Sequence, residues 1–245
     1  MANKKVGVIS QARMTSTRLP GKVLIQVGGK TMLQHHIDRL RQAGLDVYLA
    51  TTTNDSDDPI AAYAQQAAIP CYRGDEQNVL SRYYGCALEY GLDVIVRVTS
   101  DCPLIDGNLV ADALQQYLTW DDESVYLSNA LQRTFPRGFD FEIFSFSLLE
   151  EAFQNASKSA DLEHVTPYIN QNKSGRVKLR HYTQTEDASQ YRITLDTPED
   201  LQLITLLIER YGAQNLEGKE IIRVLQSHPE LQNINTHVEQ KKLGE

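Results

Sequence analysis

The sequence has little cysteine, and the three cysteines exclude two kinds of scaffold. Cys71, Cys86 and Cys102 are an odd number without the paired spacing of a metal site, so neither a disulfide framework nor a zinc site is expected. The start MANKKVGVIS has an apolar run of only five residues, and no stretch approaches the ~20 apolar residues that cross a bilayer. We therefore expect a cytoplasmic protein with reduced thiols and no membrane partner.

Positive charge is also scarce. The 245 residues carry 24 Lys and Arg against 32 Asp and Glu, which gives a formal net charge of -8. Binding of nucleic acid or of an anionic membrane needs an extended basic face, so neither partner is expected. An anionic ligand would have to be met by a local cluster of cations.

The first 37 residues hold such a cluster, because the first acidic residue is Asp38. The segment QARMTSTRLPGK (residues 11–22), here called the opening loop, carries Arg13, Arg18 and Lys22 with no acid between them. Guanidinium groups bind pairs of oxygens and lysine adds a point charge, a combination that suits a polyphosphate. The alternative is three solvated surface cations, which charge alone does not exclude.

Short β-branched runs alternate with segments of helical period in the first half of the chain. The expected strands are residues 6–10, 45–50, 69–72 and 94–99, and the expected helices are residues 31–43, 59–68 and 79–90. This order predicts a mostly parallel sheet with helices on both faces, with ligands beyond the carboxyl ends of the strands. Gly28-Gly29-Lys30-Thr31 ends like a Walker loop, but position 24 is leucine, so a tight turn is expected.

From about residue 122 the pattern changes. The expected strands are residues 125–128, 141–146, 177–182 and 192–195, and the expected helices are residues 148–155, 199–209 and 217–227. Here we expect mixed or antiparallel pairing, because the strict alternation of strand and helix ends.

Two aspartates stand in similar places, after an apolar run and before a proline. Asp101 follows the expected strand 94–99, and Asp196 follows Ile193-Thr194-Leu195. Mg²⁺ prefers one or two carboxylates together with phosphate oxygens, so the pair predicts a magnesium site. The alternatives are a turn-forming aspartate at position 101 and a helix N-cap at position 196.

The stretch VISQARMTSTRLPGKVL resembles the signature of the cytidylyltransferases that activate sugar acids, in particular the SpsF-type branch of spore-coat polysaccharide biosynthesis. Matching motifs follow in family order over nearly the whole chain: RGDEQNVLSRYY, VIVRVTSDCPLID, FPRGFDFEIFS, EHVTPYI and ITLDTPEDL. The relatives include the synthetases that make CMP-Kdo and CMP-sialic acid. The resemblance implies a Rossmann-like, three-layer α/β nucleotidyltransferase fold with a mostly parallel central sheet and a smaller mixed or antiparallel insertion for the acceptor or for dimerisation.

The resemblance also implies roles for residues of this chain. The nucleoside triphosphate is assigned to Gln11, Ala12, Arg13, Ser16, Arg18 and Lys22, with Mg²⁺ on Asp101 and Asp196 and catalytic roles for Arg13, Lys22 and Asp101. Relatives with Gln-Gly-Asp at the first aspartate place other groups beside the metal than Thr99 and Ser100. We expect a homodimer of single-domain chains (residues 1–245), with a nucleotide-binding half (1–121), an acceptor or dimerisation part (122–190) and a final part with the second metal aspartate (191–245).

The region after the third expected strand supplies candidates for the base and the phosphates. In relatives it lies near the nucleotide, which points to Arg73, Asn78 and Arg82. The alternative is a capped helix with a solvated arginine. No residue distinguishes cytosine from another base.

The acceptor candidates by resemblance are Arg137, Asp140, Glu142, Glu163 and His164. Relatives commonly carry an acid in place of Arg137, and an acceptor with a carboxylate or phosphate would explain this departure, as would an exposed loop charge. A hydrogen-bonded structural residue is the alternative for His164. His35 and His36 are expected on the polar face of the first helix.

Together these patterns predict a Mg²⁺-dependent enzyme that transfers CMP from CTP to a small anionic acceptor, a sugar acid or sugar phosphate of surface polysaccharide biosynthesis, and releases pyrophosphate. One alternative is another nucleoside triphosphate, or a non-sugar phosphorylated or phosphonate acceptor. A second is a glycosyltransferase of related fold, whose clear Asp-X-Asp is absent where SDCP stands. A non-catalytic sugar-nucleotide binding module would lack the metal aspartates.

Overall fold

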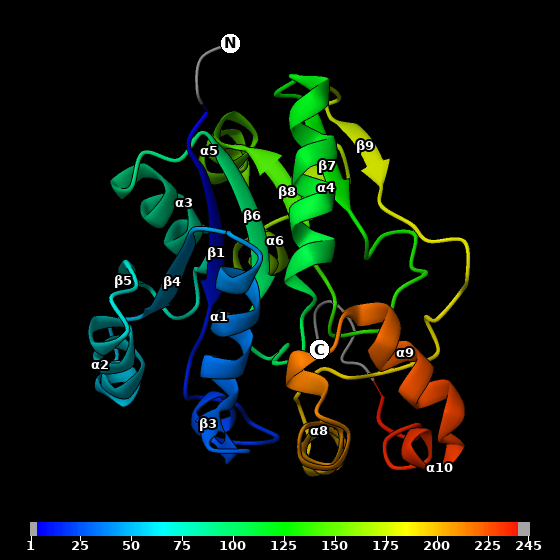
Figure 1. Cartoon of the computed structure of the whole chain (residues 1–245). Helices are drawn as coiled ribbons and strands as arrows, with labels where there is room; N and C mark the ends of the chain where they lie inside the picture. Colours follow the sequence, from blue (N-terminus) through cyan, green and yellow to red (C-terminus); the bar gives the residue numbers. More distant parts are fainter. Residues whose placement is uncertain (1–3, 240–245) are drawn as a thin grey trace.

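The computed structural model describes residues 4–239, and a seven-stranded sheet runs through its centre (Figure 1). The strands lie in the order β5 (Cys71–Gly74), β4 (Val47–Thr52), β1 (Val6–Gln11), β6 (Val94–Thr99), β8 (Glu142–Ser145), β7 (Val125–Ser128) and β9 (Lys178–His181). The first four are parallel, β9 is parallel to β7, and β8 is antiparallel to both of its neighbours. The mostly parallel sheet and the mixed pairing of the second half are therefore confirmed.

Helices cover both faces of the sheet, because successive strand residues point to opposite faces and both sets are apolar. Val8 of β1 belongs to the buried cluster that includes α1 (Met32–Gln42) and α4 (Gly107–Trp120). The next residue, Ile9, belongs to the cluster that includes α3 (Val79–Glu89) and α5 (Phe146–Asn155). The result is the predicted three-layer α/β fold (Figure 1).

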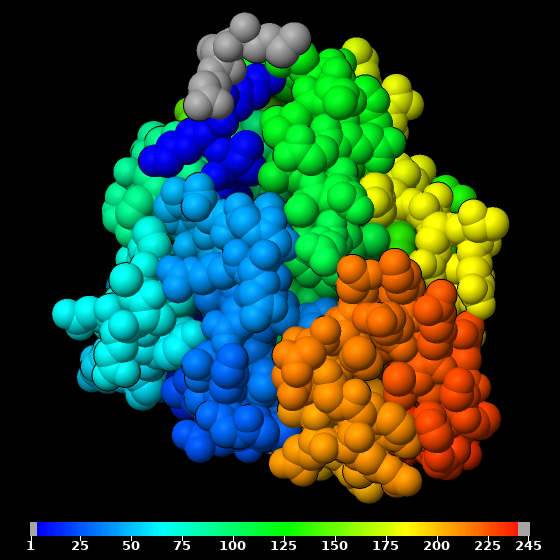
Figure 2. Space-filling model, in the orientation of Figure 1, coloured from blue at the N-terminus to red at the C-terminus, as the bar shows by residue number. Residues whose placement is uncertain are grey.

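A third buried cluster joins the C-terminal helices to the beginning of the chain. In it, α8 (Pro198–Tyr211), α9 (Gly218–Ser227) and α10 (Pro229–Gln232) pack with Val27 and Met32, and Figure 2 shows this C-terminal part directly against the N-terminal segment. The other short elements are β2 (Gln26–Val27), β3 (Lys30–Thr31), α2 (Asp58–Gln66), α6 (Ser159–His164), α7 (Pro167–Asn170), η1 (Lys22–Leu24), η2 (Asp55–Asp57) and η3 (Ala213–Asn215). None of the helices within residues 4–239 combines the length and apolar character needed to span a membrane.

Most expected elements are present, and β6 and β7 match their predicted ranges residue for residue. The prediction contains no element between residues 99 and 122, where the structure has α4. This helix begins after Asp106, whose carboxylate accepts hydrogen bonds from two amides of the first turn, and it buries one apolar face. Strands from residues 1–121 and 122–190 share one sheet, and the division of the chain at 121 and 190 stays a prediction.

The expected strand at residues 192–195 is wrong. Within the described part of the chain this run forms a single bridge, between Arg192 and Arg137, and no ladder. Its amides are divided between two segments: Ile193 donates to the carbonyl oxygen of Arg137 (2.8 Å) and Leu195 to that of Asp101 (2.7 Å). The run therefore connects the two segments across the carboxyl end of the sheet instead of joining it.

The tight turn at Gly28-Gly29 is confirmed. Both residues have positive φ, 59° and 81°, and they connect the two-residue strands β2 and β3 as a hairpin. Nζ of Lys30 donates to Asp38 (2.6 Å). The segment is therefore a turn before α1 and not a Walker loop.

The expectation that His35 and His36 lie on a polar face is wrong, because both side chains are buried. A ring nitrogen of His35 bonds to the carbonyl oxygen of Val27 (2.9 Å). His36 bonds through Nε2 to the hydroxyl of Ser10 (2.9 Å) and through Nδ1 to the carbonyl oxygen of Cys102 (2.8 Å). Their polar atoms therefore find partners inside the protein, which the helical period did not indicate.

Candidate active site

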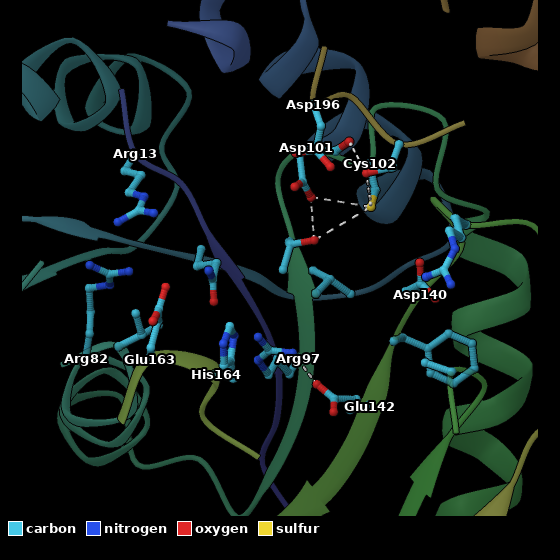
Figure 3. Close-up of a pocket in the computed structure, with 18 of the residues that line it drawn as sticks. Arg13, Arg82, Arg97, Asp101, Cys102, Asp140, Glu142, Glu163, His164 and Asp196 are labelled. Atoms are coloured by element: carbon cyan, nitrogen blue, oxygen red, sulfur yellow. Dashed lines mark hydrogen bonds and ion pairs between the residues drawn. The ribbon is translucent and has the colours of Figure 1, made fainter. Parts of the chain in front are cut away.

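Two hollows meet where β1 and β6 end. One, of about 390 Å³, is lined by the opening loop, and we call it the loop hollow. The other, of about 420 Å³, is lined by Arg97, Arg133 and Arg137, and we call it the arginine hollow (Figure 3). Seven residues line both hollows and form what we call the shared rim: Gln11, Arg13, Arg82, Thr99, Asp101, Glu163 and Asp196. The sheet edge expected to bind ligands therefore holds a double site.

Main-chain hydrogen bonds fold the opening loop back on itself. The amide of Gly21 donates to the carbonyl oxygen of Met14 (3.0 Å), and the amide of Met14 donates to the buried Asp57 (2.7 Å). Gly21 has a φ of 67°, which favours glycine, and leads directly into η1. Apart from the shared rim, the charged residues that line the loop hollow are Arg18 and Lys22, so this part of the site has two positive charges and no negative one.

Asp101 and Asp196 meet at one ammonium group. Nζ of Lys22 donates to Oδ2 of Asp101 (3.2 Å), to Oδ1 of Asp196 (2.7 Å) and to the carbonyl oxygen of Leu195 (2.7 Å). Only 11% of the Lys22 side chain is exposed. The two aspartates, 95 residues apart in the sequence, thus lie at one point, with Lys22 between them.

The other oxygens of the two carboxylates are also engaged. Oδ1 of Asp101 accepts a hydrogen bond from the hydroxyl of Thr99 (2.5 Å). Oδ2 of Asp196 lies 3.1 Å from the guanidinium group of Arg18 and 3.0 Å from that of Arg192. Both carboxylates are therefore held in fixed orientations from several sides.

A buried brace stands behind Asp196. Arg192 pairs with the fully buried Asp200 (2.9 Å), and Oδ1 of Asp200 also accepts a hydrogen bond from Asn235 (2.8 Å). Asp200 forms a capping box with Thr197, which is the N-cap of α8. The alternative that Asp196 is the N-cap is therefore wrong, and its carboxylate is left for the site.

The charges of the pair stabilise each other. Burial lowers the pKa of Lys22, but Asp101 and Asp196 outweigh burial and leave that pKa above its ordinary value. Burial raises the pKa of Asp101, but Lys22 and the Thr99 hydroxyl outweigh it, so this pKa lies below its usual range. Lys22 and Asp101 are therefore both charged at neutral pH.

The donor set at this point fits Mg²⁺. Two hard carboxylates line both hollows, and Mg²⁺ typically takes one or two carboxylates and completes its shell with phosphate oxygens and water. Among residues 4–239, no group of three or more His, Cys, Asp or Glu side chains could hold a metal without such help. The site therefore suits an ion that arrives with a phosphate ligand.

Three arginines line the arginine hollow without belonging to the shared rim, and two of them have an acidic partner. Arg97 pairs with Glu142, whose carboxylate also accepts hydrogen bonds from the hydroxyl groups of Tyr126 and Thr166. Arg133 pairs with Asp140 (2.5 Å). All four residues line the hollow, and Figure 3 shows Asp140 and Glu142 on neighbouring parts of its wall.

Arg137 is the third arginine, and its side chain makes no hydrogen bond or ion pair within residues 4–239. Its main chain is fixed, since its amide donates to the carbonyl oxygen of Tyr191 (3.0 Å) and its carbonyl accepts from Ile193. The next residue, Gly138, has a φ of 109°, and a Cβ there would lie 2.7 Å from the Ile193 carbonyl group. Burial and the nearby Arg133 lower the pKa of Arg137. A fixed and unpaired cation therefore faces the hollow.

Glu163 and His164 reach the site from a strained turn. Val165 has φ 71° and ψ -54°, rare for a β-branched residue, and the amide of Thr166 donates to the carbonyl oxygen of His164 (2.8 Å), which closes a γ-turn. Val165 is fully buried, which holds the turn. The side chains of Glu163 and His164 have no hydrogen-bond or ion-pair partner in the described chain. The structure therefore does not support the alternative of a hydrogen-bonded structural histidine.

Of the three candidates between residues 73 and 82, only Arg82 lies at the site. It lines both hollows and is 1% exposed. Arg73 donates to two main-chain carbonyls and pairs with Asp58 (2.7 Å), and Asn78 caps α3. Local structure uses the polar groups of Arg73 and Asn78, and neither residue lines one of the two hollows, so their contact with a nucleotide stays a prediction that the geometry does not support.

The other nucleotide candidates, from the opening loop, line the hollows. Gln11 and Arg13 belong to the shared rim, and Ala12 and Ser16 line the loop hollow. Sequence reasoning missed Arg97 and Arg133. Arg97 had a signal, because it is the one charged residue inside the apolar run of β6, whereas nothing in the local sequence marks Arg133.

Known proteins are similar to this chain in sequence and in fold. The model of the cytidylyltransferase family matches residues 7–235. The spore coat polysaccharide biosynthesis protein SpsF of Bacillus subtilis is 31% identical over 231 residues, 91% of this chain and 94% of that protein. The 3-deoxy-manno-octulosonate cytidylyltransferase of Solibacter usitatus is 41% identical over 109 residues, 43% of this chain and 42% of that protein. A solved cytidylyltransferase from Leptospira borgpetersenii is 33% identical, with a TM-score of 0.90 over 98% of this chain and 100% of that one.

Proposed function

The chain belongs to the cytidylyltransferase family, and on this premise we propose that it transfers CMP from CTP to a hydroxyl oxygen of a sugar acid, with release of pyrophosphate. The name of the Solibacter relative supports CTP and a sugar acid as the reactants. The name of the Bacillus relative supports a product used in polysaccharide biosynthesis. Both names describe those proteins, and the site geometry must carry the proposal for this chain.

The observation that carries it is the distribution of charge across the double site. The residues that line only the loop hollow have two positive charges, Arg18 and Lys22. Within the shared rim, two arginines face three carboxylates. The residues that line only the arginine hollow comprise three arginines and two carboxylates. In this order, the three zones are complementary in charge to a triphosphate, to a divalent metal ion and to an acidic acceptor with one negative charge.

The rim is where the two substrates would meet. The acceptor hydroxyl attacks the α-phosphorus of CTP, the new P–O bond forms, the bond to the departing pyrophosphate breaks, and the hydroxyl proton passes to the solvent. Arg13, Arg18 and Lys22 stabilise the negative charge on the phosphate oxygens, as preorganised cations do in phosphoryl transfer. When bound at Asp101 and Asp196, Mg²⁺ would supply further positive charge beside the reacting phosphorus.

Arg137 is the residue we propose for the carboxylate of the acceptor. Arg97 and Arg133 are already neutralised by Glu142 and Asp140, so Arg137 supplies the one excess charge among the residues that line only the arginine hollow. Guanidinium and carboxylate form a strong, often bidentate pair. Glu163 and His164, which have no partner in the described chain, are then free to accept and donate hydrogen bonds to sugar hydroxyls.

A pyrophosphate-release screen tests the proposal. The four nucleoside triphosphates are crossed with sugar acids, their neutral analogues, and phosphorylated and phosphonate acceptors, each with and without Mg²⁺. We expect pyrophosphate only with Mg²⁺, CTP and a sugar acid. Release with another base, or with a phosphorylated or phosphonate acceptor alone, would replace the proposal by that alternative. Consumption of a nucleotide sugar without pyrophosphate would favour a glycosyltransferase.

A further inference from the structure

Lys22 occupies the position between Asp101 and Asp196 that a divalent cation needs. Its Nζ contacts one oxygen of each carboxylate, at 3.2 and 2.7 Å, and also the carbonyl oxygen of Leu195. The two carboxylate oxygens that accept hydrogen bonds from Lys22 are therefore already paired with its positive charge. A metal ion that bridges the same carboxylates has to displace this ammonium group.

The cluster around this point is already neutral. Three cations, Lys22, Arg18 and Arg192, are connected by ion pairs to three carboxylates, Asp101, Asp196 and Asp200. A divalent ion alone would add two positive charges and leave the ammonium of Lys22 without its acceptors in a mostly buried place, which is unfavourable. An ion that arrives with a triphosphate brings more negative than positive charge.

Lys22 also borders the hollow proposed for the triphosphate. It lines the loop hollow as well as contacting the rim, and lysine carries its charge on a flexible chain with rotatable donors. Its ammonium group can therefore turn from the two aspartates to phosphate oxygens in the hollow while η1 stays in place. Each carboxylate oxygen that it leaves becomes free for the metal.

We infer that Lys22 is an internal counter-ion that closes the metal site until a nucleotide is present. In the free chain it neutralises Asp101 and Asp196 and excludes the divalent ion. When the triphosphate enters, Lys22 moves to the phosphates and the aspartates take the metal, so metal and nucleotide bind together. This inference rests on the proposed function only in that the ligand is a nucleoside triphosphate.

Binding of Mn²⁺, measured by electron paramagnetic resonance without nucleotide, tests this role. We expect Lys22→Met, which keeps the chain length and removes the charge, to bind Mn²⁺ at least ten times more tightly than the unmodified protein. Adding CTP should tighten Mn²⁺ binding in the unmodified protein and narrow this difference. Lys30→Met, which removes a lysine paired with Asp38 outside the site, should leave Mn²⁺ affinity unchanged. Equal or weaker binding by Lys22→Met would overturn the inference.

A second measurement needs no substitution at Lys22. The buried ammonium, held by three acceptors, should give a slowly exchanging lysine Nζ signal in the NMR spectrum of the unmodified protein. We expect this signal to be unchanged by Mg²⁺ alone and to shift with Mg²⁺ and CTP together; a shift with Mg²⁺ alone would contradict the inference. Failure of every nucleotide in the pyrophosphate screen would overturn the proposed function, while the metal titration without nucleotide would still decide the role of Lys22.

Discussion

The loop hollow and the arginine hollow are assembled from the sequence in different ways. The residues that line only the loop hollow lie between positions 12 and 23, with Ser100 as the exception. Those that line only the arginine hollow come from α3, β6, the segment around β8, the γ-turn at Val165 and the run before α8. Apart from Ser100 and the shared rim, one hollow is lined by a continuous segment, whereas the other is lined by several elements that are distant in the sequence.

This difference matches what each hollow has to recognise. Phosphate groups repeat the same charge at short intervals, so closely spaced cations on one loop can meet them. A small acceptor has few groups of different kinds, and only side chains from several elements can match them. In the arginine hollow, Arg97 and Arg133 are accordingly neutralised by neighbouring acids, which leaves Arg137 as the selective charge. Under the proposed function, the loop hollow would bind the triphosphate through several cations, and the arginine hollow would select the acceptor through one.

The shared rim lines both hollows, and Asp101 is one of its two acids that pair with Lys22. We expect Asp101→Asn to lower kcat by about a thousandfold, because it removes a proposed metal ligand and one acceptor of Lys22. Pyrophosphate release under saturating CTP and acceptor measures the effect. Asp112→Asn, on the exposed side of α4, is the matched control. A kcat within tenfold of the unmodified protein, with an unchanged melting temperature, would remove Asp101 from the proposed chemistry.

The contrast between the hollows also explains how much could be predicted from the sequence. Parallel order, the strands β6 and β7, the opening loop and both aspartates follow from local patterns, because apolar runs, turn residues and charge gaps are visible over a few positions. Arg73 and Asn78 were expected at the site but lie outside both hollows. The local sequence does not distinguish a side chain that binds main-chain carbonyls or caps a helix from one that binds a ligand. Arg133 and the γ-turn at Val165 depend on distant contacts and could not be predicted.

The support behind the two hollows differs in a way that pH can reveal. Behind the loop hollow, burial lowers the pKa of His36 to about 4 from its ordinary 6.5, and the neutral ring bonds to Ser10 and Cys102. Between pH 6.5 and 4 the unfolded chain takes up a proton that the folded chain does not, so His36 destabilises the fold as the pH falls, by about 3 kcal/mol in total. In the lining of the arginine hollow, Glu142 is instead paired with Arg97.

Denaturant unfolding at a series of pH values checks this second prediction. We expect His36→Gln to reduce the fall in the free energy of unfolding between pH 6.5 and 4, whatever it does to stability at pH 7. His237→Gln, which changes an exposed histidine, should leave the slope unchanged. The same slope in His36→Gln and in the unmodified protein would show that His36 is not the group that titrates.

Arg137 tests whether the arginine hollow selects its ligand by one charge. We expect Arg137→Gln to raise KM for a sugar acid by roughly 10- to 100-fold, the size of a lost charge-assisted hydrogen bond, with KM for CTP unchanged. A neutral acceptor analogue should bind the variant and the unmodified protein equally well. Arg137→Lys should recover part of the loss, since it restores the charge without the bidentate fork. If KM for CTP rises as much as KM for the acceptor, the two hollows are not separate in function.

Arg18 is the counterpart in the loop hollow, and its effect should be the smallest and of the opposite kind. Its side chain is partly exposed and shares Asp196 with Arg192, so the aspartate stays oriented when Arg18 is lost. We expect Arg18→Gln to raise KM for CTP about five- to tenfold, with KM for the acceptor unchanged, and the effect to shrink with added salt, since partly exposed charges are screened. Steady-state kinetics at two salt concentrations, run beside Arg137→Gln, measure both constants. The two variants each remove one guanidinium group, from opposite sides of the same rim. If Arg18→Gln also weakens acceptor binding, the two hollows are not separate in function.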